Sequence, residues 1–370
     1  MSFHRDRLTW LAYALLAWFA YLQAAPGLVV PYLRDELDIG YTTGGLHVAA
    51  FATGSMVAGL TATRIEAAVG RRALLWGSAA GMAIGVAGLV TGPVAAATVG
   101  ALLVAGFGGG LLLVTVQALL SDHHGPQRAI ALTEANVFAS AAYVVLVGAV
   151  ALFSWRVALV TSFLVPLALI LTSRTVPITT ARHETEQHGR LSGAFYVAAA
   201  MMFCTVSAEW CVTAWGASFA KEAADVSADT AVALMFGYFG GVLVGRVSGA
   251  VLARRFAAAR LLAVALVVAA AGFAILWPSA SSAQVFAGLF VIGIGLGNLF
   301  PFALAVTVAL APDRAQPASS RAVLAGSTAV LAAPLTIGAL ADATSITSAL
   351  LVVPVMLGLA AVGLAAIRVS

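Results

Sequence analysis

Long apolar stretches, separated by short polar segments, run along almost the whole chain. A helix needs roughly 20 apolar residues to cross a hydrocarbon core of about 30 Å. Twelve stretches come close to that length. They lie at 9–31, 41–63, 73–92, 94–120, 129–152, 157–173, 192–219, 230–252, 261–278, 283–310, 322–341 and 346–367. The pattern predicts an all-α polytopic membrane protein with twelve transmembrane helices.

The composition agrees with this prediction. Hydrophobic residues make up 62% of the chain and charged residues 9%, too few polar side chains to cover the surface of a soluble domain. The connections are short except for the polar segment 174–190. The chain therefore has no stretch long enough for a soluble output domain. Any function is therefore expected inside the helical bundle.

The positive residues are distributed unevenly between the two sides of the predicted membrane. If the N-terminus is cytoplasmic, fifteen basic residues fall in cytoplasmic segments and three in outer loops. The positive-inside rule then places both termini in the cytoplasm. The net charge of +4 therefore reflects topology and does not indicate a nucleic-acid partner. The excess of arginine over lysine is typical of a GC-rich bacterial genome, so we expect a bacterial inner-membrane protein.

Glycine patterns repeat between the two halves of the chain. Gly54 and Gly59 match Gly240 and Gly245 at a shift of 186, and Gly106, Gly108 and Gly110 match Gly293, Gly295 and Gly297 at a shift of 187. A constant offset over successive helices indicates a duplicated unit. We expect an N-terminal six-helix bundle at 1–175, a cytoplasmic linker at 176–190 and a C-terminal six-helix bundle at 191–370.

The connection after the second span carries a family resemblance. Its residues are Arg64, Glu66, Gly70, Arg71 and Arg72. This stretch resembles the loop signature of the major facilitator superfamily, which ends in Asp, basic, any, Gly, Arg, basic. The Asp position falls on Ala67, with Glu66 one residue earlier. The resemblance implies two pseudo-symmetric six-helix bundles that carry a solute by alternating access, with a site between the halves.

Three charged residues lie well inside predicted spans, where a charge facing lipid costs several kcal/mol. They are Glu134, Glu209 and Arg246. Burial disfavours the ionised form of a carboxyl group, so Glu209 and Glu134 are the predicted proton-coupling residues. The resemblance also implies that the fifth and eighth spans pack against each other. Glu134 and Arg246 are therefore predicted to pair as a cytoplasmic gate.

Polar and aromatic residues near the middle of several spans are predicted to line a substrate cavity. They are Tyr21, Gln23, Asn136, Tyr143, Trp210, Trp215, Tyr238, Asn298 and Phe300. The alternative interpretation is that they are core residues or interfacial anchors, as Trp and Tyr often are. Gln23 lies 186 residues before Glu209, close to the repeat shift.

The sequence favours a proton-coupled secondary transporter that exports amphipathic or drug-like compounds. The alternatives are a symporter or facilitator for uptake of a sugar, an organic acid or another metabolite, and a membrane sensor or scaffold. No set of residues suits an enzyme, a metal or another cofactor. The expected partners are a small-molecule substrate, protons and the lipid bilayer, with the protein acting as a monomer.

Overall fold

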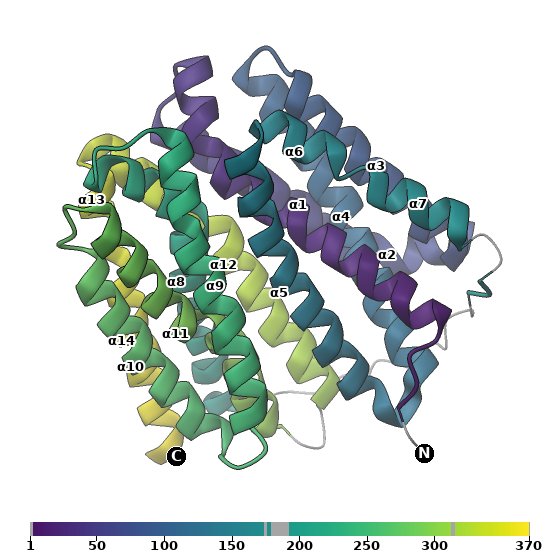
Figure 1. Ribbon diagram of the computed structural model, residues 1–370. Coiled ribbons are helices and arrows are strands. Elements are labelled where there is room, and N and C mark those ends of the chain that lie inside the picture. Colours follow the sequence, from purple (N-terminus) through teal and green to yellow (C-terminus); the bar gives the residue numbers. More distant parts are fainter. Residues whose placement is uncertain (1–2, 174–175, 179–191, 312–314, 370) are drawn as a thin grey trace. The chain divides into compact units, whose positions relative to one another are not determined.

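The computed structural model describes residues 3–173, 176–178, 192–311 and 315–369. Every regular element among these residues is a helix (Figure 1), which confirms the predicted all-α class. Most of the predicted linker, residues 179–190, lies outside the described residues.

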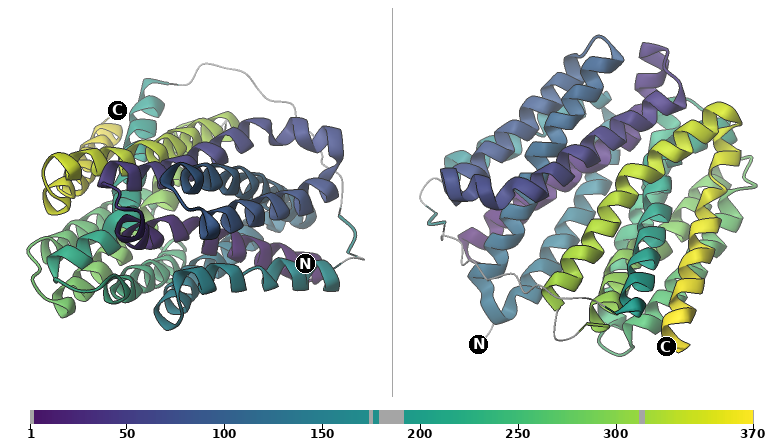
Figure 2. Two further views of the ribbon diagram at one scale, coloured as in Figure 1. Left: turned by 90° about the horizontal axis from the view of Figure 1, so that it is seen from above. Right: turned by 180° about the vertical axis from the view of Figure 1, so that it is seen from behind.

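The chain divides into two compact units. The first consists of Met1–Ile39 and Leu46–His183, and the second of Gly40–Gly45 and Glu184–Ser370. Within each unit the helices pack side by side along their lengths (Figure 2). The predicted domain bounds stay a prediction, because the segment in which they fall is largely undescribed.

The first unit contains the helices of the first six predicted spans. They are α1 (Arg7–Leu37), α2 (Tyr41–Val69), α3 (Arg71–Thr91), α4 (Ala95–His124), the 3-10 helix η1 (Gly125–Gln127), α5 (Arg128–Leu152), α6 (Trp155–Thr161) and α7 (Leu164–Thr172). The first residues of α2 belong to the second unit.

The second unit contains the other six predicted spans. They are α8 (Gly193–Ala223), α9 (Ala228–Leu252), α10 (Ala258–Leu276), α11 (Ser282–Ala309), α12 (Ala315–Ala343), α13 (Ile346–Ala349) and α14 (Val352–Val369).

Eleven segments of the described chain are long and apolar enough to cross a membrane. One of them, Ala95–Leu152, has 58 residues and holds both α4 and α5, joined by η1. When these two helices are counted separately, the predicted number of twelve agrees with the structure.

The last span of each unit is broken in the same way. In the first unit the break between α6 and α7 lies just before Pro166, and in the second unit the break between α13 and α14 lies just before Pro354. Proline has no N–H for the carbonyl four residues earlier and its ring crowds that carbonyl. The two breaks are thus a further sign of the duplication.

The start of α2 is fixed by an acidic side chain of α12. The N–H groups of Tyr41 and Thr42 donate to the two carboxylate oxygens of Asp342 at 2.7 and 2.8 Å. The first N–H groups of a helix have no partner within it and attract negative charge. Asp342 therefore caps α2. Its hydrogen bonds connect the start of α2 to α12, in agreement with the place of Gly40–Gly45 in the second unit.

Glycines bring helix backbones into close contact in each unit, and the contacts correspond. Gly106 of α4 faces the carbonyl of Phe51, and Gly293 of α11 faces the carbonyl of Tyr238. Small residues permit this approach between membrane helices. Both members of the pair are shifted by 187, which indicates that the two units share one packing pattern.

The same shift corrects one sequence match. Gly54 faces the carbonyl of Leu103, and its counterpart in contact with Phe290 is Gly241, not Gly240. The match of Gly54 with Gly240 was therefore wrong by one residue. With the corrected register, the position of Gly59 corresponds to Arg246 in the second unit.

Gly241→Ala is expected to destabilise the protein by about 1–3 kcal/mol, the usual cost of overpacking. A Cβ at this position would overlap the carbonyl oxygen of Phe290. Gly240→Ala is the matched control, since nothing lies within 4 Å of a Cβ there and alanine is the better helix former. Thermal denaturation in detergent should show a lower midpoint for Gly241→Ala alone. Equal midpoints would contradict this packing.

Candidate functional site

Glu209 lies at the centre of α8. This helix starts after Ser192, whose side chain accepts a hydrogen bond from the N–H of Phe195, as expected of an N-cap residue. Glu209 is the seventeenth of its 31 residues. The carboxyl group is thus held by a long, well-capped helix, far from both ends.

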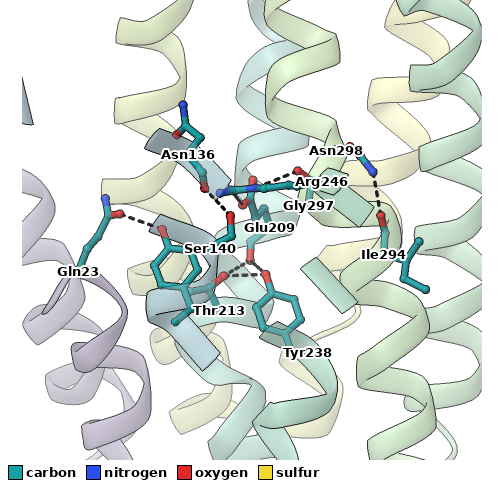
Figure 3. A network of polar contacts seen from close by, with 11 residues as sticks. Gln23, Asn136, Ser140, Glu209, Thr213, Tyr238, Arg246, Ile294, Gly297 and Asn298 are labelled. Carbon is teal, nitrogen blue, oxygen red and sulfur yellow. Dashed lines mark hydrogen bonds and ion pairs between the residues drawn. The ribbon is translucent and has the colours of Figure 1, made fainter. Parts of the chain in front are cut away.

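The guanidinium group of Arg246, on α9, lies beside this carboxyl group (Figure 3). Its Nη2 is 3.7 Å from Oε1 of Glu209, and the side chains are 20% and 14% exposed, respectively. Nε of Arg246 also donates to the carbonyl oxygen of Gly297 on α11 at 3.3 Å. Pairing offsets part of the cost of burying each charge, so α8, α9 and α11 together form a charged site.

Tyr238 and Thr213 fix the backbone of α8 next to Glu209. The hydroxyl groups of these two residues are 2.7 Å apart. Both also donate to the carbonyl oxygen of Glu209, Thr213 at 2.9 Å and Tyr238 at 3.3 Å (Figure 3). Tyr238 is almost completely buried. The contacts link α9 to α8 and hold the acidic residue in place.

Asn298 supports the same site from α11. Its amide nitrogen donates to the carbonyl oxygen of Gly245 at 2.7 Å. It also donates to the carbonyl oxygen of Ile294 at 3.3 Å (Figure 3). Gly245 directly precedes Arg246 in α9. The buried amide therefore joins α9 to α11 next to the arginine, and its place as a cavity residue stays a prediction.

The first unit carries a neutral polar pair at the equivalent place. Gln23 is the seventeenth residue of α1, just as Glu209 is the seventeenth of α8. The hydroxyl of Tyr143 on α5 donates to the side-chain oxygen of Gln23 at 3.3 Å. About two turns before Tyr143, the exposed Asn136 donates to the carbonyl of Leu132.

The other predicted cavity residues differ in exposure. Tyr21 is buried and its hydroxyl donates to the carbonyl of Ala158 at 2.8 Å. Trp215 is fully buried, and its indole N–H donates to the carbonyl of Pro334 at 2.9 Å. Trp210 and Phe300 are partly exposed. Contact of any of them with a substrate stays a prediction.

Glu134 has its partners within the first unit. Arg5 donates to both of its carboxylate oxygens, from Nε at 2.8 Å and from Nη2 at 2.6 Å. The hydroxyl of Tyr13 adds a third contact at 3.1 Å. The gate between Glu134 and Arg246 joins residues of different units and stays a prediction, but each charge already has a partner in its own unit.

The loop signature forms a compact ion-pair cluster. Gly70 has a φ of 82°, a conformation that favours glycine, and it turns the chain from α2 into α3. The buried side chain of Arg71 then pairs with Glu66 and Asp122, each at 2.6 Å. Glu66 thus provides a carboxylate one residue before the position in the family signature.

Asp122 was not predicted as part of this cluster. It lies in the last turn of α4, at the end of an apolar run. Since consecutive spans alternate in direction, the end of the fourth span reaches the same side as the connection between the second and third. This alternation in direction could have predicted that Asp122 lies near Arg71. The exposed Arg64 and Arg72 complete the predicted signature.

The sequence profile described as Major Facilitator Superfamily matches residues 9–282, and the chain belongs to this superfamily. A search of curated proteins found no match. The family resemblance and the fold predicted from the sequence are thus confirmed.

Solved structures show the same fold. A bacterial homolog of the human lysosomal transporter Spinster, inward-facing and unoccupied, gives a TM-score of 0.80 at 14% identity over 98% of this chain and 97% of that chain. The nucleoside transporter NupG gives 0.79 at 11% identity over 98% and 99%. The fucose:proton symporter FucP of E. coli gives 0.65 at 16% identity over 97% and 98%. Membership of this superfamily indicates a transporter rather than an enzyme.

Arg71→Lys is expected to destabilise the protein by about 1–3 kcal/mol, because one ammonium group cannot hold both carboxylates as the guanidinium fork does and a poorly paired buried charge is costly. The neighbouring Arg72→Lys is the control, since Arg72 is exposed. Thermal denaturation of the purified variants gives the comparison. An unchanged midpoint for Arg71→Lys would show that the cluster adds nothing to stability.

Proposed function

We propose that the protein is a secondary active transporter that moves a small organic solute by alternating access and couples this movement to protons through Glu209. The superfamily fold supports the transport role. The single observation that supports the coupling is the partly exposed Glu209–Arg246 ion pair in the middle of α8.

The geometry of this pair suits a reversible proton site. A charge-assisted hydrogen bond between nitrogen and oxygen is about 2.7–2.9 Å long, whereas the two side chains are 3.7 Å apart. The two side chains are therefore held together mainly by the attraction of their charges and not by a short hydrogen bond. Protonation of Glu209 would remove that attraction and release Arg246 from it. A passive facilitator needs no such titrating group.

The proposed setting follows from the same features. The distribution of basic residues supports a multi-pass protein of a bacterial inner membrane with both termini in the cytoplasm. We further propose a monomer, with α8, α9 and α11 of one chain providing the coupling site. The direction of transport stays a prediction: the sequence favours export of an amphipathic or drug-like compound, with uptake by a symporter as the alternative.

Infrared difference spectroscopy of the reconstituted protein tests the protonation site without knowledge of the substrate. Between alkaline and acid buffer, the wild type is expected to gain a carboxylic-acid carbonyl band that Glu209→Gln lacks. Glu134→Gln is the control, and it should keep this band because its own carboxylate is a separate group paired with Arg5. Identical difference spectra for wild type and Glu209→Gln would disprove the assignment.

Transport itself is tested in proteoliposomes with an imposed proton gradient, screened against sugars, nucleosides, organic acids and amines. A solute that the wild type accumulates should no longer be accumulated by Glu209→Gln, although its exchange across the membrane should continue. If no solute crosses in any condition, the transport role is wrong.

A further inference from the structure

The charges on α8 and α9 point to a substrate class. We infer that the solute is a monovalent organic anion, a carboxylate, which Arg246 binds while Glu209 takes up one proton. This inference rests on the proposed function and deepens it. Its chemistry is an exchange of partners, in which the carboxylate of the solute replaces the carboxylate of Glu209 beside the guanidinium group.

Charge balance in a poorly hydrated site favours this exchange. The pair of Glu209 and Arg246 is neutral as a whole. An anion that enters together with a proton keeps the site neutral, with the anion on Arg246 and a neutral acid at Glu209. A cation would give the site a net positive charge, and a dianion with one proton would give it a net negative charge. Each uncompensated charge is costly away from water.

The chemistry of arginine supports a carboxylate as the ligand. A guanidinium group is permanently charged and its fork of N–H groups matches a carboxylate. In this chain the contact of Nε with the carbonyl of Gly297 orients the group, and Nη2 faces the carboxyl of Glu209. The position that Glu209 occupies is therefore one where a second carboxylate can be held.

No other ionic partner competes for Glu209 in the described part of the chain. From α9 it faces Arg246 and, at its backbone carbonyl, the hydroxyl of Tyr238. The structure pairs it with no acidic or basic side chain of α11, α12 or α14 among the described residues. Protonation of Glu209 therefore acts directly on Arg246.

The surroundings suit an organic acid with an apolar part. Val206 and Met202 lie three and seven residues before Glu209 and continue the same face of α8. Atoms of Val206, Met202 and Phe300 lie 3.4–3.8 Å from the place of a Cβ at Gly326 on α12. Val206 and Met202 are buried, so the neighbourhood of Glu209 on this side is apolar.

The duplication shows that the charged pair belongs to one unit. Gln23 takes the place of Glu209 as the seventeenth residue of its helix, and at the shift of 187 Gly59 takes the place of Arg246. The shared packing of the helices thus does not require the two charges. Because anion and proton bind together, an inward proton gradient should drive uptake of the anion.

Binding calorimetry of the purified protein tests the inference. The probes are hexanoate and phenylacetate, each compared with the amide and the amine of the same carbon skeleton. Titrations in two buffers of different ionisation enthalpy give the number of protons taken up per ligand. The wild type is expected to bind the carboxylates in preference to the amides and amines, with uptake of about one proton per anion.

Variants separate ligand binding from a structural role of the pair. Glu209→Gln should bind phenylacetate about tenfold tighter than the wild type and without proton uptake, because the carboxylate of Glu209 no longer competes with the ligand for Arg246. The double variant Glu209→Gln with Arg246→Gln carries no buried charge at the site, so it should fold but not bind phenylacetate. Arg260→Gln, at an exposed arginine of the same unit, should behave as the wild type.

Three results would overturn the inference: preference for the amines, binding of either carboxylate without proton uptake, or no carboxylate binding by the wild type. Phenylacetate binding by the double variant would also exclude Arg246 as the anion site. The infrared band of Glu209 is independent of these results. If the band is present and carboxylates do not bind, the substrate class is wrong while the proposed proton site stands.

Discussion

The interaction on which the account depends is the attraction between Glu209 and Arg246. Each charge alone would be costly in the middle of an apolar bundle, and each reduces the cost of the other. Because the contact is 3.7 Å long and both side chains are partly exposed, a proton or an anionic ligand can compete for it. The hydrogen bonds around it, from Tyr238 and Asn298, fix the backbones that carry the pair and leave the charges themselves exchangeable.

The rest of each unit is a rigid framework for such a site. Pairs of contacts such as Gly106 with Phe51 and Gly293 with Tyr238 recur in both units at one shift, so the same backbone packing was used twice. The polar residues differ. At the position of Glu209 the first unit has Gln23, bonded to Tyr143. The two units thus share their helix packing and differ in the charges at this place.

The transmembrane helices could be predicted from the sequence because the thickness of the bilayer sets the length of an apolar helix. The sequence also identified Glu209, because a charge in a span is rare and costly. It could not determine the partners. Arg5 lies before the first span, and its pairing with Glu134 depends on how the chain turns into α1. The match of Gly54 with Gly240 was wrong by one residue. The register depends on which glycine lies against a backbone carbonyl, as Gly241 does against Phe290, and the amino-acid sequence alone does not show this.

Glu209 and Arg246 are expected to attract each other only while the carboxyl group is ionised. A double-mutant cycle on the free energy of unfolding measures this directly, with Glu209→Gln, Arg246→Gln and the double variant in alkaline and in acid buffer. We expect a favourable coupling energy in alkaline buffer that disappears in acid buffer. A coupling energy of zero in both buffers, or one that does not change with pH, would contradict it.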